Sequence, residues 1–583
     1  MVVKLNRPDI RYEVESLIRM LLGETPVTIV LPGEAIPDDN DSIAITVQEQ
    51  EKCCLCHVVA CLNGEKREAS SPSTVDRTEI EQTICRMLYN QLTALLGHTL
   101  PWGMLTGVRP VKLVRQMTEV GMTEADVMQK LSDYGVSEER AQLSMDTWHN
   151  QREIVEALSS DQISLYVAIP FCPSRCSYCS FVSHSIERAG NMLEEYLPLL
   201  LRELELTGRL VKEAGLTVIS VYIGGGTPTT LTAEQMDRLL QEIRKDFDLT
   251  ACEEFTVEAG RPDTITLEKL RVMAQNGVDR ISINPQTLNN SVLKAIGRRH
   301  TAEDFFDAWK LSEEFHFDRN VDLIAGLPED TFESFRSTIE QVLALHPENI
   351  TVHTLTVKHA STLKEEGPQK RTAMEMVEYS RYLLEEAGYR PYYLYRQKGT
   401  VEALENVGYT LPGKACKYNV YIMDDGHTII SAGAGGVTKL VPNGPQRITR
   451  SFNYKYPYEY INQRKNLLVL INVFSYGFIT LMALICVANV VNTISTNISL
   501  RRRDFAMLRS VGLPYSGIKK MMVFECLLYG IRSIIFAAPA SIVLSYLIYE
   551  GYGGSGEFSF GFFIPWYAIV IAVAGVFVVV GIS

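Results

Sequence analysis

Short apolar runs alternate with longer amphipathic stretches from residue 161 onward, and this alternation constrains the fold more than any other feature. Six runs have the composition of β-strands: residues 164–170, 218–224, 254–260, 280–286, 319–326 and 349–356. Strands separated by helices favour a parallel sheet with right-handed crossovers, and therefore an α/β fold. Six such units predict a partial (β/α)6 barrel, in which functional residues lie at the C-terminal ends of the strands.

The length of the chain predicts several domains. Its 583 residues exceed one hydrophobic core, since a domain averages about 150 residues. We expect an N-terminal α/β domain over 1–160, the barrel over 161–395, a small C-terminal α+β domain over 396–463 and a tail over 464–583. The net charge of −13 argues against a nucleic-acid partner. The first twenty residues lack the apolar core of a signal peptide, so we expect the part before the tail to be cytoplasmic.

The last 118 residues contain three long apolar segments. Residues 466–500 and 558–583 hold no Asp, Glu, Lys or Arg, and residues 526–549 hold only Arg532. A helix needs about 20 apolar residues to cross the hydrocarbon layer of a membrane. The tail is therefore predicted to form three transmembrane helices in the cell membrane. Buried helices of a soluble fold are the alternative.

Two unusual motifs follow the first two predicted strands. Cys172, Cys176 and Cys179 have CxxxCxxC spacing, which suits three irons of a [4Fe-4S] cluster and leaves the fourth iron open. Structural zinc normally takes four ligands, often from two separated pairs, and no second pair follows here. The run Gly224–Pro228, GGGTP, lets the backbone approach a ligand closely, which suits a bound amino-acid moiety.

These motifs carry a family resemblance. YVAIPFCPSRCSYCSF followed by YIGGGTPT resembles the radical S-adenosylmethionine (SAM) superfamily, and within it the oxygen-independent coproporphyrinogen III oxidase group with its HemZ-like dehydrogenase branch. VEAGRPDTIT, SINPQTLNNSVLKAIGRRHT, VDLIAGLPEDT and ENVGYTLPGKACKYNVYIMDDGHTIISAGAGG extend the resemblance in the same order over residues 161–460. WGMLTGVRPVKLVRQ (102–116) is similar to the N-terminal region of the HemZ-like branch.

The resemblance implies that Cys172, Cys176 and Cys179 ligate the cluster and that the amine and carboxylate of SAM chelate its open iron. Tyr166, in the strand before the cysteines, would lie beside the cluster. The reaction implied is oxidative decarboxylation of coproporphyrinogen III propionates to vinyl groups in heme biosynthesis. It would require a porphyrinogen substrate and an electron donor for the cluster.

The resemblance also implies a set of SAM-binding residues. Gly225, Gly226 and Thr227 would hold the amino group, Glu258 would face the ammonium and Gln286 would contact the ribose.

Two further members of this implied set have plain structural alternatives. Arg298 would bind the SAM carboxylate, and Asp322 would be a second polar contact. Arg298 is alternatively a solvated cation at a helix end, and Asp322 a turn or cap residue.

Two departures from the family pattern concern the substrate. Ser180-Phe181 stands where related oxidases often carry a further Cys, and Ala168 stands where the family frequently has His. Both departures also distinguish heme-chaperone-like relatives, which bind heme and keep the SAM cluster. The HemZ-like region at 102–116 favours the dehydrogenase, an argument by analogy.

Other cysteines and histidines are weaker candidates for functional residues. Residues Cys53 to Cys61 hold four thiols and His57, a possible metal set, but AITVQEQEKCCLCHVVACLNGEKRE is typical of two strands around a turn, whose neighbouring side chains point to opposite faces. His353 and His359 flank a strand end and are interpreted as either substrate-side or structural.

The tail carries a second resemblance. INVFSYGFITLMALICVANVVNTISTNISLRRRDFAMLRSVG and MMVFECLLYG resemble the FtsX-like permease domain of ABC transporters, over about residues 464–583, without its first helix and extracellular domain. In that family the RRRDFAMLRSVG loop is cytoplasmic and contacts an ATPase subunit, so a partner ATPase is implied. A transport component with an attached barrel is thus the competing function.

The charges around the first apolar segment do not fit one orientation. Six cations between residues 501 and 520 place that loop in the cytoplasm, which would put residue 465 and the barrel outside. SAM and a low-potential reductant are cytosolic, so the two requirements conflict. Either the tail inserts inverted, or the first segment does not cross the membrane, or the join at about 462–466 is a truncated or chimeric union of two genes. We expect the last.

Overall fold

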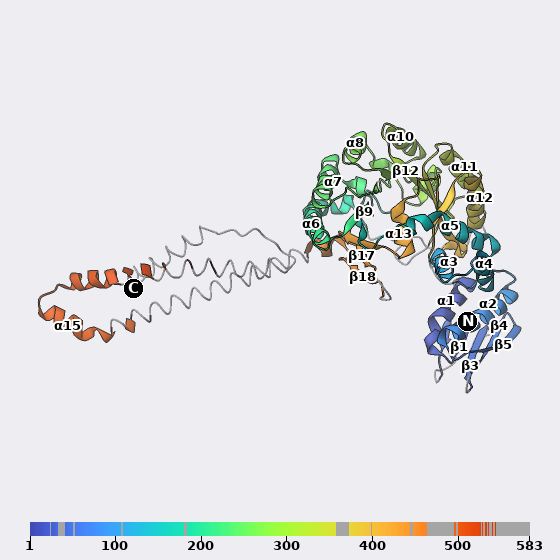
Figure 1. Cartoon of the computed structure of the whole chain (residues 1–583), viewed down its shortest axis with the longest axis horizontal. Helices are drawn as coiled ribbons and strands as arrows, with labels where there is room; N and C mark the ends of the chain where they lie inside the picture. The colour runs from blue at the N-terminus through green and yellow to red at the C-terminus, as the bar shows by residue number, and fades with distance from the viewer. Residues whose placement is uncertain are drawn as a thin grey trace. The chain divides into compact units, whose positions relative to one another are not determined.

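The structure, a computed structural model, describes two parts of the chain (Figure 1). It describes residues 1–462 except 24, 33–40, 51–52, 106–108, 180–182, 357–371, 398 and 443–446, and then 499–525 with a few positions on either side. The chain divides into two units, Met1–Tyr460 and Ile461–Ser583. Each unit is described by itself.

The six predicted barrel strands are confirmed. They are β6 (Gln162–Ile169), β9 (Thr217–Gly225), β10 (Glu254–Val257), β11 (Arg280–Ser282), β12 (Asp318–Ala325) and β13 (Asn349–Thr354). Neighbouring strands of this set pair in parallel, in the order β6-β9-β10-β11-β12-β13. Their C-terminal ends therefore meet at one rim of the barrel.

Helices cover the outer face of this sheet (Figure 1). They are α6 (Ile186–Glu213), α7 (Ala233–Asp246), α8 (Leu267–Gln275), α10 (Ala302–Ser312), α11 (Phe332–Leu343) and α12 (Thr372–Glu386), with the short α9 (Asn290–Ala295) at the rim. In α7, Met236, Leu239, Leu240 and Ile243 are buried at helical spacing, and a capping box at Thr232 begins the helix. The spacing of apolar residues along the sequence thus determines which face of each helix packs against the sheet.

The residues after 389 extend the same sheet at both edges. β15 (Glu405–Thr410) pairs antiparallel with β13, and β14 (Arg390–Arg396) pairs antiparallel with β15 at the outer edge. β16 (Thr428–Ala432) pairs in parallel with β6, and β17 (Val437–Leu440) and β18 (Thr449–Phe452) follow it. A partial barrel leaves two open edges, and these strands pair with both. The stretch predicted as a small C-terminal domain therefore contributes strands to the barrel sheet, together with α13 (Lys417–Asp424).

The N-terminal region has its own sheet and core. β1 (Val2–Leu5), β2 (Thr28–Val30), β3 (Ser42–Glu49), β4 (Cys54–Leu62) and β5 (Glu65–Ser73) form it in the order β2-β1-β3-β4-β5. Its buried side chains pack with those of α1 (Arg11–Leu22) and α2 (Arg77–Leu96). Three helices lead from it to the barrel: α3 (Pro110–Glu119), α4 (Glu124–Asp133) and α5 (Glu138–Glu156).

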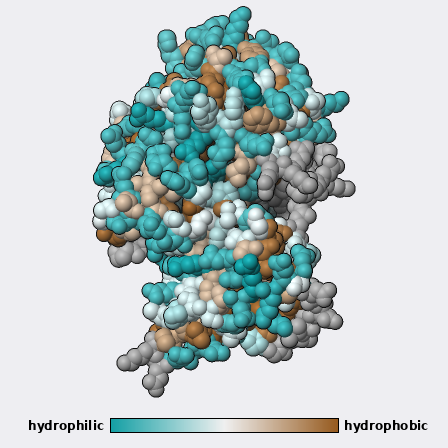
Figure 2. Space-filling model, turned by 90° about the vertical axis from the view of Figure 1, so that its right-hand side faces the viewer, coloured by the Kyte–Doolittle hydropathy of each residue, from teal (hydrophilic) through white to brown (hydrophobic). Residues whose placement is uncertain are grey.

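Apolar side chains of the first unit are mainly internal. On the face shown in Figure 2, hydrophilic residues predominate and apolar residues occur in small separate patches. The buried set includes Val3 in β1, Val420 in α13 and Ile429 in β16. Burial of these side chains is the main stabilising contribution to both sheets.

The cysteine-rich segment at 53–61 is a strand, as predicted. In β4 the thiols of Cys54 and Cys56 are buried in the core, while His57 and Cys61 lie on the other face. His57 Nδ1 lies 2.7 Å from Ser70 Oγ on β5. Among the described residues, no group of three or more Cys, His, Asp or Glu side chains is placed to hold one metal ion.

This geometry predicts different effects for two matched cysteine substitutions. Cys56 is fully buried, so Cys56→Ser places a hydroxyl in the apolar core and should lower the free energy of unfolding by about 1–3 kcal/mol. Cys61→Ser, on the opposite face, should change it by less than about 0.5 kcal/mol. Thermal unfolding with and without a zinc chelator measures both. A midpoint that falls with chelator would favour the metal interpretation.

The tail unit is described only around its polar loop. α15 (Arg502–Ser510) and a helical run over 515–525 lie there, and Arg501 Nη1 forms an ion pair with Glu525 at 2.8 Å. Among the described residues, no helix is both long enough and apolar enough to cross a membrane. The three predicted transmembrane helices are therefore not supported here; their segments lie largely outside the described residues.

Candidate active site

The three motif cysteines lie on the loop after β6, at the C-terminal rim of the barrel. Cys172 belongs to β7 (Phe171–Cys172), which pairs with β8 (His184–Ser185). The loop is tied to its neighbours by backbone bonds: Ser177 N–H donates to Ile296 O at 3.0 Å, and Thr227 N–H to Phe171 O at 2.7 Å. The sheet thus positions a loop that would otherwise be free to move.

Polar and cationic groups surround two of the thiols. Thr227 Oγ1 lies 3.5 Å from Cys172 Sγ, and Arg261 Nη1 lies 3.8 Å from Cys176 Sγ. Arg261 is 3 % exposed and also pairs with Asp263 at 3.0 Å. Burial raises the pKa of Cys172, with an opposing effect from the Thr227 hydroxyl. The positive charge of Arg261 would offset part of the negative charge of a cluster bound at this loop.

The glycine run after β9 passes very close to the cysteine loop. Gly225 has φ +107°, a conformation that L side chains rarely adopt. A Cβ on Gly226 would lie 2.5 Å from Phe171 O and 2.8 Å from Ile169 O, both backbone atoms. Gly226 N–H also donates to Ile169 O at 2.8 Å. Glycine is therefore required at these positions by the approach of the two loops.

Glu258 begins the loop after β10 and faces a group of tyrosines. Tyr222 OH donates to Glu258 Oε1 at 2.5 Å. The ring of Tyr166 stacks with the rings of Tyr222 and Tyr418, at centroid distances of 6.2 and 6.0 Å. Burial raises the pKa of Glu258 from 4.5 to about 7, against the opposing effect of the Tyr222 hydrogen bond. A cation bound here would restore the charged carboxylate.

This raised pKa predicts how stability depends on pH. The folded chain binds a proton at Glu258 that the unfolded chain releases between pH 4.5 and 7, so stability falls as pH rises through that window. Glu258→Gln should therefore raise the free energy of unfolding above pH 7 by about 1–2 kcal/mol. This figure is smaller than the full pKa shift would give, because Glu258 is only partly buried. It should change little at pH 5.

Thermal midpoints at pH 5 and pH 8 measure this effect. The exposed carboxylate Glu268 supplies the control variant, Glu268→Gln, which should behave like the wild type at both pH values. A Glu258→Gln variant that is less stable than the wild type at pH 8 would contradict the assignment.

Gln286 lies beyond the end of β11, next to Asp322 of β12. Gln286 adopts φ +70°, a strained conformation for a non-glycine residue, and its N–H donates to Asp322 O at 3.1 Å. Asn284 Nδ2 and Asn320 Nδ2 each donate to a different oxygen of the Asp322 carboxylate at 2.8 Å. Asp322 lies inside β12, so it is not a turn or cap residue.

Arg298 is partly buried and not a solvated helix-end cation. It follows α9, and its Nη1 donates to Asn284 O at 2.6 Å. Burial lowers its pKa, but Tyr178 and Cys176 outweigh that effect and raise it. Arg298 therefore lies between the cysteine loop and the Asn284–Asp322 network.

His353 joins this network from β13, while His359 lies outside the described residues. His353 Nε2 is 3.7 Å from Asp322 Oδ2, and Tyr395 OH is 3.2 Å from its Nδ1. Burial raises the pKa of Asp322, but the hydrogen bond from His353 and others lowers it overall. His353 thus faces the site, where it orients a carboxylate.

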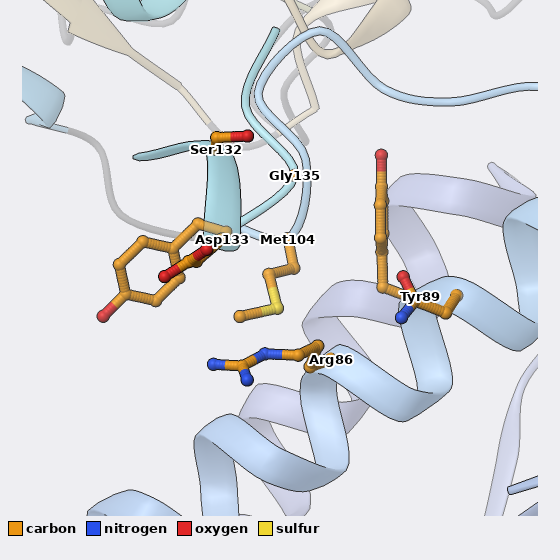
Figure 3. Close-up of a pocket in the computed structure, with 8 residues that line it drawn as sticks. Arg86, Tyr89, Met104, Ser132, Asp133 and Gly135 are labelled. Carbon is orange, nitrogen blue, oxygen red and sulfur yellow. The ribbon is translucent and has the colours of Figure 1, made fainter. Parts of the chain in front are cut away.

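Another hollow in the structure lies away from these residues. It is a cavity of about 270 Å³ between α2 and the end of α4, with Met104 projecting between Arg86 and Asp133 (Figure 3). None of the predicted site residues lines it. The predicted site residues lie at the barrel rim instead.

Two family comparisons match separate parts of the chain. Residues 166–342 match the radical SAM superfamily, and residues 476–583 match the FtsX-like permease C-terminal family. The oxygen-independent coproporphyrinogen-III oxidase-like protein HemZ of Bacillus subtilis is 40 % identical over 396 residues, covering 66 % of this chain and 79 % of that protein. The chain belongs to the HemZ-like oxygen-independent coproporphyrinogen III oxidase family.

Two further relatives are less similar to this chain than the HemZ protein of Bacillus subtilis. The heme chaperone HemW of Lactococcus lactis is 33 % identical over 47 % of this chain and 69 % of its own length. The structure of coproporphyrinogen III oxidase (HemN) from Escherichia coli, described as a radical SAM enzyme, has 23 % identity and a TM-score of 0.43, covering 54 % of this chain and 71 % of that one.

Radical SAM proteins use a [4Fe-4S] cluster and SAM as cofactors, and the HemZ-like site fits both. Each thiolate of such a cluster binds a different iron, so the three sulfurs need not converge on one point. The close backbone at Gly226 and the carboxylate of Glu258 suit the amino-acid end of SAM.

Three residues of this site were not predicted from the sequence. Arg261 contacts Cys176, Asn284 joins Asp322 to Arg298, and Tyr222 bonds Glu258. Arg261 and Asn284 lie within or beside the quoted motifs, so their position after strands β10 and β11 was an available signal. Nothing in the sequence distinguishes Tyr222 from other strand residues, because its role depends on contact with Glu258 of the neighbouring segment.

Proposed function

We propose that the chain is a radical SAM enzyme that converts coproporphyrinogen III propionates to vinyl groups without oxygen, giving protoporphyrinogen IX. The observation that carries the proposal is the cysteine loop, glycine run and Glu258 gathered at one rim of a HemZ-like barrel. The enzyme part would act in the cytoplasm, with a one-electron donor as partner. No nucleic acid is involved.

The site residues divide into two roles under this proposal. Cys172, Cys176 and Cys179 would hold the cluster, with Tyr166 beside it. For SAM, the binding residues would be Gly225, Gly226, Thr227, Glu258, Gln286, Arg298 and Asp322. The neutral form of Glu258 that burial favours would become charged when the SAM ammonium arrives, so binding and ionisation are linked.

The cofactors would supply a carbon radical able to take a hydrogen atom from an unactivated C–H bond. A propionate side chain would lose one hydrogen atom to it. The C–CO₂ bond then breaks, CO₂ leaves, one electron passes to an acceptor and the vinyl C=C bond forms. The residues of the chain position the propionate and exclude water.

An anaerobic assay with the full-length chain tests the proposal. Coproporphyrinogen III, SAM and dithionite are supplied, and porphyrins are separated after oxidation. The proposal predicts products with one and two vinyl groups. Unchanged coproporphyrinogen, in protein that carries four irons and cleaves SAM, would overturn it.

Heme-chaperone function is the second candidate, favoured by the HemW match and by Ala168. Ser180 lies outside the described residues. This candidate predicts tight heme binding with a Soret band and no decarboxylation. Titration of heme into the same preparation separates the two functions.

The tail is proposed to attach the protein to the cell membrane. Its apolar segments and the FtsX-like match at 476–583 support this, and a partner ABC ATPase would contact the loop at 501–510. The competing function, a transport component with an attached barrel, predicts ATPase-dependent transport instead. A carbonate-washed membrane fraction should retain the chain. Sequencing native DNA across codons 455–475 tests the expected chimeric join, which one continuous frame would contradict.

A further inference from the structure

None of the described residues of the HemZ-like segment at 102–116 is among the site residues assigned above to the barrel rim. The segment docks on the barrel elsewhere. Trp102 Nε1 donates to Glu405 Oε2 at 2.6 Å, and Arg396 Nη1 donates to Leu105 O at 2.5 Å. The chain then enters α3, whose cations Arg109, Lys112 and Arg115 recur every three residues and so share one face.

These three cations converge on two carboxylates at the C-terminal end of α13, its last residue Asp424 and its C-cap Asp425. Arg109 pairs with Asp425 and Arg115 with Asp424, and Lys112 Nζ lies 3.4 Å from Asp425 Oδ2. Two more cations lie beside Asp425 at the sheet edge. Lys439 Nζ of β17 and Arg450 Nη2 of β18 are 3.7 and 3.2 Å from Asp425 Oδ1. We call these seven residues the α3 cluster.

Positive charge exceeds negative charge in the α3 cluster. Five cations face Asp424, Asp425 and a third carboxylate, Glu119, which lies 3.5 Å from Arg115 Nε. Burial is the largest cause that lowers the pKa of Lys112, and the neighbouring cations lower it further. The same two causes lower the pKa of Lys439 to about 7. Even with Lys439 partly deprotonated at neutral pH, the other four cations outnumber the three carboxylates, so positive charge remains unneutralised in a partly desolvated place.

The cluster is open on one side. The side chains of Arg109, Lys112 and Arg450 are 24 %, 29 % and 42 % exposed, whereas Lys439 is 3 % exposed beneath them. Arg109 is also the N-cap of α3, a ten-residue helix, and makes no side-chain capping bond. A helix N-terminus favours anions, and guanidinium groups bind carboxylate and phosphate oxygens in pairs.

The α3 cluster and the cysteine loop lie at opposite ends of the barrel strands. Asp425 precedes the first residue of β16, whereas Cys172 follows the last residue of β6, and these two strands run in parallel. A ligand at the cluster would therefore not be the substrate at the rim. It would instead bridge α3 to β18.

We propose that the α3 cluster is a binding site for a small multivalent oxyanion, a polyphosphate or a polycarboxylate. Bound there, the oxyanion neutralises the excess charge and ties the HemZ-like N-terminal segment to the edge of the barrel sheet.

Calorimetric titration of the full-length chain in detergent tests this inference. Pyrophosphate and citrate are the two probes, each at constant ionic strength set with sodium chloride. We expect one-to-one binding of at least one probe, and the tighter probe identifies phosphate or carboxylate as the ligand class. Binding should weaken at least tenfold in the double variant Lys112→Gln/Arg450→Gln. The exposed cation variant Lys66→Gln is the control and should bind as the wild type does.

Two outcomes would overturn the inference: no one-to-one binding of either probe, or equal affinity in the double variant. If the double variant does not fold, hydrogen exchange on the wild type replaces it. Pyrophosphate or citrate should then protect the first turn of α3 and β18, and unchanged exchange in both elements would overturn the inference. These measurements need no catalytic activity, so their result is independent of the proposed function.

Discussion

Cys176→Ala should reduce SAM cleavage to the background of the assay. Cys176 is 9 % exposed and its Sγ lies 3.8 Å from Arg261 Nη1, so alanine would remove a proposed cluster ligand and the sulfur that faces a buried guanidinium. With two thiolates left on the loop, a [4Fe-4S] cluster loses one of its three protein ligands. We expect iron content to fall together with 5′-deoxyadenosine formation.

Cys252→Ala is the matched control for this variant. Cys252 is also a partly buried free thiol, but it bonds Glu254 O at the start of β10, at the other end of the strand from the site. It should keep the iron content and activity of the wild type. Iron, acid-labile sulfide and 5′-deoxyadenosine are measured after anaerobic reconstitution. A Cys176→Ala protein that still cleaves SAM would contradict the cluster assignment.

Gly226→Ala should weaken SAM binding about 10- to 100-fold, because overpacking of this kind costs about 1–3 kcal/mol. The added Cβ would meet Phe171 O and Ile169 O, at 2.5 and 2.8 Å. Both atoms are backbone, so relief requires that the glycine run and the cysteine loop separate. That movement displaces Thr227 from Cys172, which it contacts through its hydroxyl.

Gly260→Ala is the control for Gly226→Ala. A Cβ on Gly260 would meet nothing closer than Asn284 Nδ2 at 3.8 Å, an ordinary contact. Equilibrium binding of SAM to the reconstituted proteins measures both variants. Equal affinity in Gly226→Ala and Gly260→Ala would contradict the steric argument.

The strands and the site motifs could be predicted from the sequence because each depends on local pattern. Runs with strand composition alternate with segments whose apolar residues have helical spacing, and this alternation predicts the barrel. The barrel in turn places Cys172, Gly225 and Glu258 at one rim. The predicted strand 280–286 is shorter in the structure, since β11 ends at Ser282. Gln286 lies beyond it with positive φ, a conformation that residue type alone does not indicate.

The contacts between distant segments could not be predicted. Tyr222 meets Glu258 only through the register of β9 on β10, and Asn284 meets Asp322 only through that of β11 on β12. Likewise, the pairing of β15 and β16 with opposite edges of the sheet depends on chain closure, which no local pattern encodes. The tail prediction rests on composition, and its apolar segments lie largely outside the described residues.

Deuterium transfer tests the central claim most directly. The full-length protein, reconstituted without oxygen, is given SAM, dithionite and coproporphyrinogen III deuterated in its propionate side chains, and 5′-deoxyadenosine is analysed by mass spectrometry. Oxidative decarboxylation predicts that 5′-deoxyadenosine gains one deuterium while CO₂ is released in equal amount. Unlabelled 5′-deoxyadenosine with no CO₂ release would contradict it.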